Sequence, residues 1–313
     1  MRAFLIRRLA TFVPTLLLIT LMVFGLQQIV PGGPAEAIAG AGSTQESIDE
    51  INRQLGLDRP LIEQYTSWIG NLVRGDLGTS YFSREPVDTL LARRLEPTVL
   101  IVVSALVLAL VIGGGAGLWA AARRRHLDGR SVLAVSGIGL AVPDFWLATI
   151  AAGFIGLDLA LLPAVGYTPL GDDWVQTIRS IILPVLVLSF ATGALVCRHV
   201  RSAVGQALDS PHIRTAWAMG LTPRQVYLGD ALRSAAPAVV TLLPLLVATL
   251  VGASVVVENV FAIPGLGGLI VQSVDNRDYA TLQGTVLLMA LLVLILNFVA
   301  DLVLARLDRR VAA

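Results

Sequence analysis

Six long apolar stretches constrain this sequence more than any other feature, because each is long enough to cross a bilayer as a helix. A membrane-spanning helix needs about 20 mostly apolar residues. The chain is 55% hydrophobic and 14% charged, whereas a soluble domain carries about 25% charged residues. The predicted spans are Leu9–Val30, Thr98–Ala122, Val132–Leu157, Ser180–Cys197, Ala235–Val257 and Tyr279–Ala305. We therefore expect an all-α, polytopic membrane protein with six transmembrane helices.

The arginines indicate how these spans are oriented. The chain has no lysine, and its arginines gather before the first span, between the second and third, between the fourth and fifth, and after the sixth. Basic residues are enriched in short cytoplasmic loops, and six crossings place these four regions on one side of the membrane. We therefore expect a multi-pass protein with both termini in the cytoplasm.

Composition also excludes some kinds of chemistry. A net charge of +1 gives no argument for binding nucleic acid. Without lysine the chain lacks the residue that a P-loop places on the phosphates of ATP. The histidines His126, His199 and His212 show no metal-ligand spacing, and the single cysteine, Cys197, excludes an internal disulfide. We therefore assign no metal site and no catalytic residue.

Residues 31–97 separate the first two spans, and we expect them to form a helical insertion outside the cytoplasm. Ser43 to Glu46 has the pattern of a capping box at the start of a helix, and Gly56 is placed to end that helix. Apolar residues recur at helical spacing over residues 61–72 and again over 87–95. A plain helical cap and a landing surface for a delivery protein both fit this pattern.

The polar loop 209–237, between the fourth and fifth spans, has strong signals for two short helices. Ser210 and Thr222 are each followed by a proline, which is the pattern of a hydroxyl N-cap with proline at the first helical position. Gly220 lies between them and suits the turn that ends the first helix. Two short helices joined at a tight turn predict a rigid cytoplasmic docking surface.

One face of the first short helix carries Ile213, Ala216 and Trp217. An apolar ridge of this kind suits a groove on a partner protein. Arg214 and Arg224 are placed to pair with acidic groups on such a partner. The alternative is a solvated connector whose tryptophan lies against the membrane surface.

Asp144 is the one ionisable residue near the middle of a predicted span, directly after Pro143 and two residues before Trp146. A charge at the centre of a bilayer costs a few kcal/mol, so this carboxylate should face protein or water. Two interpretations remain open. It either lies on a translocation path and meets an amine or amide of the cargo, or it is protonated or paired with an arginine of a partner subunit.

Several motifs resemble one family of transport proteins. The stretch Arg214-Thr-Ala-Trp-Ala-Met-Gly220-Leu-Thr-Pro-Arg224 resembles the EAA loop of ABC-importer permeases. The first-permease subunits of dipeptide, oligopeptide and nickel importers have motifs similar to Val30-Pro-Gly-Gly-Pro34, Gly56-Leu-Asp-Arg-Pro60, Arg74-Gly-Asp-Leu-Gly78, Val257-Glu-Asn-Val-Phe-Ala-Ile-Pro264-Gly-Leu-Gly267 and Asn276-Arg-Asp-Tyr279. The resemblance runs nearly end to end. Thr215 departs from it, because the EAA loop has glutamate there, and Asp144 stands where the family has a neutral residue.

The resemblance implies a type I ABC importer permease fold in a bacterial-type inner membrane. Residues 1–30 would hold the first span, 31–97 the extracytoplasmic insertion, and 98–313 the permease core with the coupling loop 209–237. Such a subunit forms half of a pore for di- or oligopeptides with a second, homologous permease. Two cytoplasmic ABC ATPase domains bind ATP and magnesium, and an extracytoplasmic solute-binding protein delivers the cargo.

We also expect roles for particular residues of such a subunit. Contacts with the ATPase are expected at Ile213, Arg214, Ala216, Trp217, Gly220 and Arg224. The translocation path is expected at Pro143, Asp144 and Trp146. Contacts with the solute-binding protein are expected at Glu258, Pro264, Gly265, Arg277 and Asp278. Nickel, glutathione or haem are alternative cargoes for the same machinery, and an ion-coupled carrier is the alternative from another class.

Overall fold

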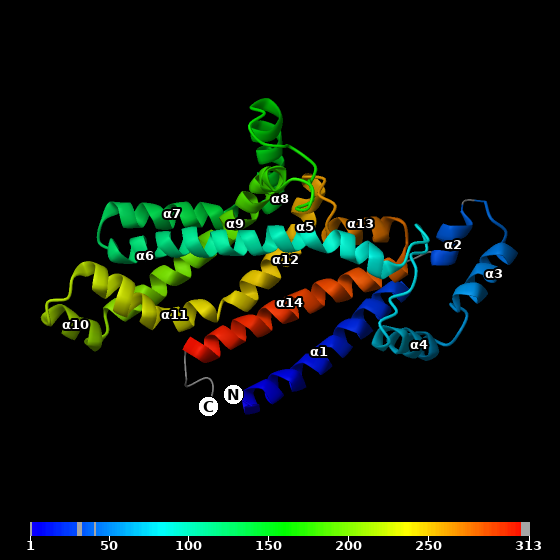
Figure 1. Ribbon diagram of the computed structural model, residues 1–313, viewed down its shortest axis with the longest axis horizontal. Helices are drawn as coiled ribbons and strands as arrows, with labels where there is room; N and C mark the ends of the chain where they lie inside the picture. The colour runs from blue at the N-terminus through cyan, green and yellow to red at the C-terminus, as the bar shows by residue number, and fades with distance from the viewer. Residues whose placement is uncertain (1, 30–32, 41, 308–313) are drawn as a thin grey trace. The chain divides into compact units, whose positions relative to one another are not determined.

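The computed structural model describes residues 2–29, 33–40 and 42–307, and the regular elements among them are helices (Figure 1). Apart from one isolated bridge between Thr79 and Pro86, this described part of the chain contains no strand pairing. The helices are α1 (Arg2–Ile29), α2 (Pro34–Ala39), α3 (Gln45–Leu55), α4 (Leu61–Val73), α5 (Val87–Leu108), η1 (Ala109–Gly113), α6 (Gly114–Ala122), α7 (Leu127–Ala141), α8 (Asp144–Ile150), η2 (Ala151–Asp158), α9 (Trp174–Leu208), α10 (Pro211–Ala218), η3 (Gln225–Ala231), α11 (Leu232–Val240), α12 (Leu243–Val260), α13 (Leu266–Asp275) and α14 (Tyr279–Leu307). The elements labelled η are π-helices. The predicted all-helical class is confirmed.

Four of these helical stretches are long and apolar enough to cross a membrane: Val87–Ala122, Trp174–Leu208, Leu243–Val260 and Tyr279–Leu304. The helix pair Leu127–Ala141 and Asp144–Asp158 also qualifies by composition, but it is bent by 95°. Within α1 the apolar part is the shorter helix Ala10–Gly25. Each predicted span therefore has an apolar helix in the structure, while the count of six crossings stays a prediction.

The third predicted span, Val132–Leu157, is not one straight helix. Proline has no N–H to donate and disfavours helical geometry in the residue before it. Accordingly, Val142 is extended with φ −83° and ψ 122°, α7 ends at Ala141, and α8 begins after Pro143. Figure 1 shows α8 leaving the line of α7. The prediction that Asp144 lies in the middle of a continuous span is therefore wrong.

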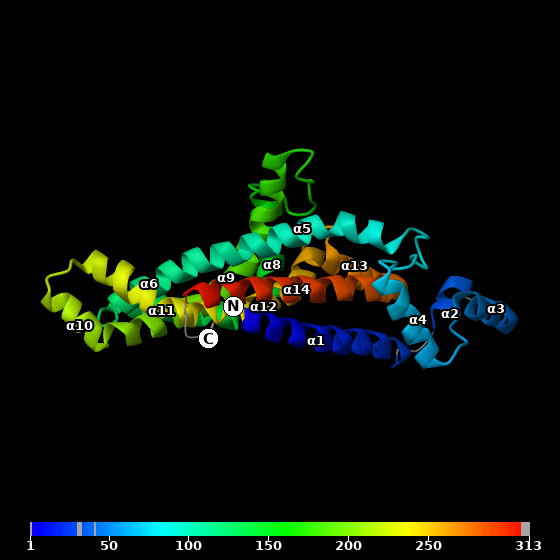
Figure 2. The ribbon, with the colours of Figure 1, turned by 60° about the horizontal axis from the view of Figure 1, so that its bottom comes forward.

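The chain divides into two compact units, one made mainly of Pro97–Ile263 and the other of Leu5–Glu96 with Pro264–Leu292. In the first unit α9 is the central helix, and α6, α7 and α11 pack along it (Figures 1 and 2). Glycines allow the backbones of η1 and α6 to approach α9 very closely. A Cβ added at Gly113 would lie 2.3 Å from the Gly193 oxygen, and one at Gly117 would lie 2.5 Å from the Cys197 oxygen. These two glycines therefore serve helix packing.

The second unit contains the insertion, in which α3 and α4 form as the sequence predicts. Gly56 ends α3 in the left-handed conformation, with φ +67°. The N-cap of α3, however, is Thr44 and not Ser43, because the Thr44 hydroxyl accepts from the Ser47 N–H at 3.4 Å while the Ser43 hydroxyl donates to backbone carbonyls. The predicted capping box therefore began one residue too early.

Helix α4 packs on α1 within the same unit. The Tyr65 ring meets Phe24 edge to face with centroids 5.4 Å apart, and the Trp68 ring stacks on Phe24 at 6.4 Å. The hydroxyls of Tyr65 and Thr20 share a hydrogen bond of 2.9 Å. The aromatic and apolar residues that recur at helical spacing over residues 61–72 include Tyr65 and Trp68, which form this cluster on α1.

Candidate functional site

The loop between α9 and α11 folds into a compact elbow, residues 209–231, made of α10 and η3. Helix α10 begins at Pro211, with Ser210 extended before it, as the sequence predicts. It ends at a glycine turn in which Gly220 has φ +79°. The Gly220 N–H donates to Trp217 and the Leu221 N–H donates to Ala216, which are the two bonds of a Schellman motif. The predicted glycine turn is confirmed.

The second helical segment of the elbow starts with reciprocal capping. The Gln225 side chain accepts from the Thr222 N–H at 2.9 Å, and the Thr222 hydroxyl accepts from the Gln225 N–H at 3.5 Å. At the first helix the hydroxyl does not cap, because the Ser210 side chain donates backwards to the Ala207 carbonyl. Only one of the two predicted hydroxyl caps therefore forms.

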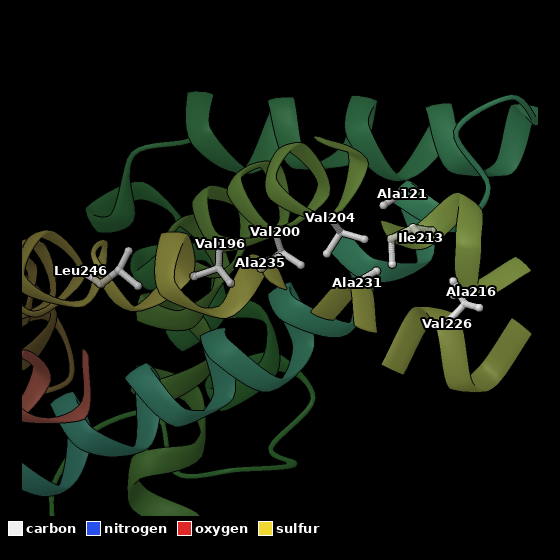
Figure 3. Close-up of a cluster of buried hydrophobic side chains, with 10 residues drawn as sticks. All are labelled: Ala121, Val196, Val200, Val204, Ile213, Ala216, Val226, Ala231, Ala235 and Leu246. Atoms are coloured by element: carbon white, nitrogen blue, oxygen red, sulfur yellow. The ribbon is translucent and has the colours of Figure 1, made fainter. Parts of the chain in front are cut away.

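The apolar face of α10 is buried inside the chain itself. Ile213 is 0% exposed and Ala216 is 4% exposed. Figure 3 shows both side chains within one apolar cluster that α9, η3 and α11 complete. The members of the cluster are Ala121, Val196, Val200, Val204, Ile213, Ala216, Val226, Ala231, Ala235 and Leu246. The prediction that Ile213 and Ala216 form a ridge for a partner is therefore wrong, because this face already has an intramolecular partner.

The outer face of the elbow carries Trp217, Arg214 and Arg224, and all three are exposed. The Trp217 ring is 41% exposed and rests edge to face on Tyr227, with centroids 6.1 Å apart. Neither arginine forms an ion pair among the residues that the structure describes. An exposed aromatic ring packed on a second ring, together with two exposed arginines, has the composition of a protein–protein contact.

Two polar contacts fix the elbow to the rest of its unit. Arg124 donates two hydrogen bonds to the Asp209 carboxylate, at 2.8 and 2.6 Å. This guanidinium holds the pKa of Asp209 below its usual range. A His212 ring nitrogen lies 3.2 Å from the Ser234 hydroxyl of α11. Sequence reasoning missed both pairs, because their members are far apart in the chain.

Asp144 is the first residue of α8, directly after the bend. A carboxylate in the first turn of a helix interacts favourably with the helix dipole. The side chain is half-buried, and within the described residues it forms no ion pair. Pro143 is exposed, and the Trp146 ring is 52% exposed. These three residues therefore lie together at a bend of the backbone, and their role in translocation stays a prediction.

The residues expected to contact a solute-binding protein do not form one surface. Glu258 is 0% exposed in α12, and its carboxylate accepts a hydrogen bond of 2.7 Å from the Thr98 hydroxyl. Gly265 is also buried. Pro264 is exposed, and Arg277 is half-buried with Glu36 3.7 Å away. The prediction of contact with a solute-binding protein is therefore wrong for Glu258 and Gly265, because both are buried. It stays a prediction for Pro264 and Arg277.

Asp278 is buried, and its carboxylate accepts hydrogen bonds from the loop before α5. Its carboxylate accepts from the Ser80 hydroxyl at 2.5 Å, the Tyr81 N–H at 3.0 Å and the Thr281 hydroxyl at 2.7 Å. Burial, and then the nearby Asp278 carboxylate, raises the pKa of the Tyr81 phenol. The prediction of a partner contact at Asp278 is therefore wrong, since its acceptor positions are occupied within the chain.

No cluster of three His, Cys, Asp or Glu side chains that could hold a metal ion occurs in the described part of the chain. The absence of a resident cofactor stays a prediction.

The sequence matches known families over nearly its whole length. Residues 113–313 match the family described as binding-protein-dependent transport system inner membrane component, and residues 1–103 match the N-terminal family of such membrane components. A peptide transport system permease protein of Brucella abortus is 34% identical over 311 residues, which is 99% of each chain. The glutathione transport system permease protein GsiC of Escherichia coli is 36% identical over 305 residues, or 97% of each chain.

The fold is also similar to that of a solved transporter. A chain of the MetNI methionine ABC transporter, in an inward-facing conformation, superposes with a TM-score of 0.57 at 22% identity. The match covers 70% of this chain and 96% of the other. At this level of identity the similarity shows a common fold.

Proposed function

Because this chain belongs to the family of binding-protein-dependent transport system inner membrane components, we propose that it is one of the two permeases of a bacterial ATP-driven importer. It would share a pore with a second permease, while separate cytoplasmic subunits bind ATP and magnesium. The cargo that we propose is a short peptide, because relatives at 34–36% identity over nearly the full length carry the names of peptide and glutathione permeases. Glutathione, itself peptide-like, is the second candidate on the same grounds.

The elbow carries the coupling step in this proposal. Trp217, Arg214 and Arg224 on its outer face would bind the ATPase, and Gly220 provides the turn that presents them. Ile213 and Ala216 anchor the inner face to α9 and η3. A force applied to α10 would therefore reach these helices as the movement of a rigid body, since packed interiors deform little. Alternating access requires two such packings that nucleotide selects.

The observation that carries this proposal is the division of α10 into a buried face and an exposed face. A helix that served only as a solvated connector would not need an apolar anchor that is 0% exposed at Ile213. Equally, an anchor alone would not leave an aromatic ring and two arginines exposed on the other side. The elbow has both an internal attachment and an exposed outer surface.

The test is reconstitution with the ATPases, second permease and binding protein of the same organism. Uptake of a labelled dipeptide into proteoliposomes should require ATP and all of the subunits. Trp217→Ala should lower uptake more than tenfold and make ATP hydrolysis independent of the binding protein. Phe82→Ala, which also removes an exposed aromatic ring, is the matched control and should retain uptake. Uptake by this chain alone, without ATPase, would contradict the proposal.

Orientation follows from the same proposal. If the elbow meets cytoplasmic ATPases, then both termini are cytoplasmic and the insertion at residues 31–97 faces outwards. Asp144, at the bend before α8, would lie where the translocation path meets the cargo. A carboxylate there would favour a cargo with a free amine.

A further inference from the structure

A basic groove lies between α7 and α9, away from the elbow. It has a volume of about 430 Å³ and is lined by Leu133 of α7 and by Arg198, His199, Arg201 and Ser202 of α9. The two arginines are one turn apart on α9, so both guanidinium groups reach the same groove. The transport mechanism described above uses none of these residues.

The groove lies at the level where the apolar part of α9 ends. The apolar run reaches Cys197, and Arg198 is the first charged residue after it. Helices α7 and α9 pack closely at Gly139, where an added Cβ would lie 2.9 Å from the Ala194 Cβ. From this contact Leu133 is six residues back along α7 and Arg201 is seven residues on along α9, which is about 9–10 Å along each axis. Both helices therefore reach the groove as they leave the apolar layer.

Within the described part of the chain, the arginines of the groove have no acidic partner. The two acids that pair at this end are already used, since Asp128 pairs with Arg123 at 3.0 Å and Asp209 pairs with Arg124. Among the described residues, Arg198 and Arg201 take part in no ion pair. Two adjacent unpaired guanidinium groups create a positive potential that attracts an anion.

The other lining groups suit a phosphodiester with a polar headgroup. A His199 ring nitrogen, Nδ1, lies 3.0 Å from the Leu195 carbonyl and therefore donates to it. This leaves Nε2 to accept a hydrogen bond from a hydroxyl group. Ser202 adds a hydroxyl that can donate to phosphate oxygen, and Leu133 adds an apolar wall.

We propose that this groove binds the headgroup of an anionic phospholipid, with Arg198 and Arg201 on the phosphate and Leu133 against the start of an acyl chain. Arginine binds phosphate in a bidentate manner, and basic pockets between membrane helices on the cytoplasmic side are suited to anionic headgroups. The position of the groove at the end of the spans favours a lipid over a soluble anion, since the leaflet presents its phosphates at this level. The inference does not depend on the identity of the cargo.

The test uses the purified full-length chain, stripped of lipid and titrated with phosphatidylglycerol in mixed micelles, with binding measured by native mass spectrometry. Phosphatidylglycerol should bind at least tenfold more tightly than phosphatidylcholine. Each arginine near the surface contributes about 1 kcal/mol to such binding, which is about fivefold in affinity. The double variant R198Q/R201Q should therefore bind about 30-fold more weakly, whereas R198K/R201K should retain most of the affinity.

The matched control is R125Q/R130Q, which removes the same charge from two exposed arginines at the same end of the helices but outside the groove. It should change the affinity less than threefold. An equal loss in both double variants would mean that general charge attracts the lipid, and it would overturn the proposal. Full competition by millimolar inorganic phosphate would identify a site for soluble anions and would also overturn it.

Discussion

The elbow geometry predicts that substitutions at neighbouring residues of α10 have different effects. A substitution on the buried face should lower stability, and one on the exposed face should lower the coupling of ATP hydrolysis to uptake. Ile213→Ala removes three carbon atoms from a side chain that is 0% exposed. At about 0.8 kcal/mol for each buried methylene, the lost burial alone is about 2.4 kcal/mol, and the cavity left behind raises the cost toward 2–5 kcal/mol. Arg214→Glu changes an exposed side chain next to it, and substitutions of that kind alter stability by about 0.5 kcal/mol or less.

The assay compares both variants in detergent and after reconstitution. Thermal unfolding followed by tryptophan fluorescence should show a clearly lower midpoint for Ile213→Ala and a nearly unchanged one for Arg214→Glu. Below the unfolding temperature, the coupling of ATP hydrolysis to uptake should instead fall more for Arg214→Glu than for Ile213→Ala. Removing one partner of a close, desolvated charge pair costs about 2–5 kcal/mol, and placing like charges together costs several kcal/mol more. Uptake per ATP hydrolysed should therefore fall more than tenfold for Arg214→Glu.

If Ile213→Ala left stability unchanged while abolishing coupling, Ile213 would be presented to a partner and would not be an internal anchor. If Arg214→Glu destabilised the chain as much as Ile213→Ala, Arg214 would have a structural role and would not be a partner contact. Ile213→Val serves as the intermediate case, since it removes one methylene and should cost about 0.5–1.5 kcal/mol.

Three further predictions concern packing, pH and cargo. Gly113→Ala should lower the unfolding free energy by about 1–3 kcal/mol, because the new Cβ would lie 2.3 Å from a carbonyl oxygen of α9, whereas Gly114→Ala, with nothing within 4 Å, should be neutral or stabilising. The lowered pKa of Asp209 means that its contribution to stability is present above the unfolded pKa of about 3.9 and is lost as the pH falls through the lower folded value, so Asp209→Asn should remove this part of the acid-induced decrease in melting temperature. Asp144→Asn should reduce uptake of cationic dipeptides more than uptake of neutral ones, and equal effects on both would exclude it from cargo selection.

The sequence predicted those parts of the fold that are determined by residues close together in the chain. The glycine turn at Gly220 follows from its freedom to adopt positive φ, and α4 follows from apolar spacing. The apolar helices follow from hydropathy alone. Their ends were less accurate, since α9 extends to Leu208 while the predicted fourth span stopped at Cys197.

Tertiary contacts decided what the sequence could not. Ile213 and Ala216 share an apolar face, but a pattern does not tell whether such a face meets the same chain or another one. Glu258 and Asp278 are charged residues near predicted loops, and burial was not expected for them. Their hydroxyl partners, Thr98 for the first and Ser80 for the second, are about 160 and 198 residues away in the chain. Only the folded structure brings these donors to the carboxylates.

Photocrosslinking can show whether the outer face of the elbow touches the ATPase. A benzophenone amino acid replaces Trp217 in the assembled transporter, and the same group replaces Phe82 in the loop before α5 as the control position. Both native side chains are exposed. We expect illumination to join the chain to the ATPase subunit from position 217 and not from position 82. A crosslink to the ATPase from position 82, or none from position 217 in an active transporter, would contradict it.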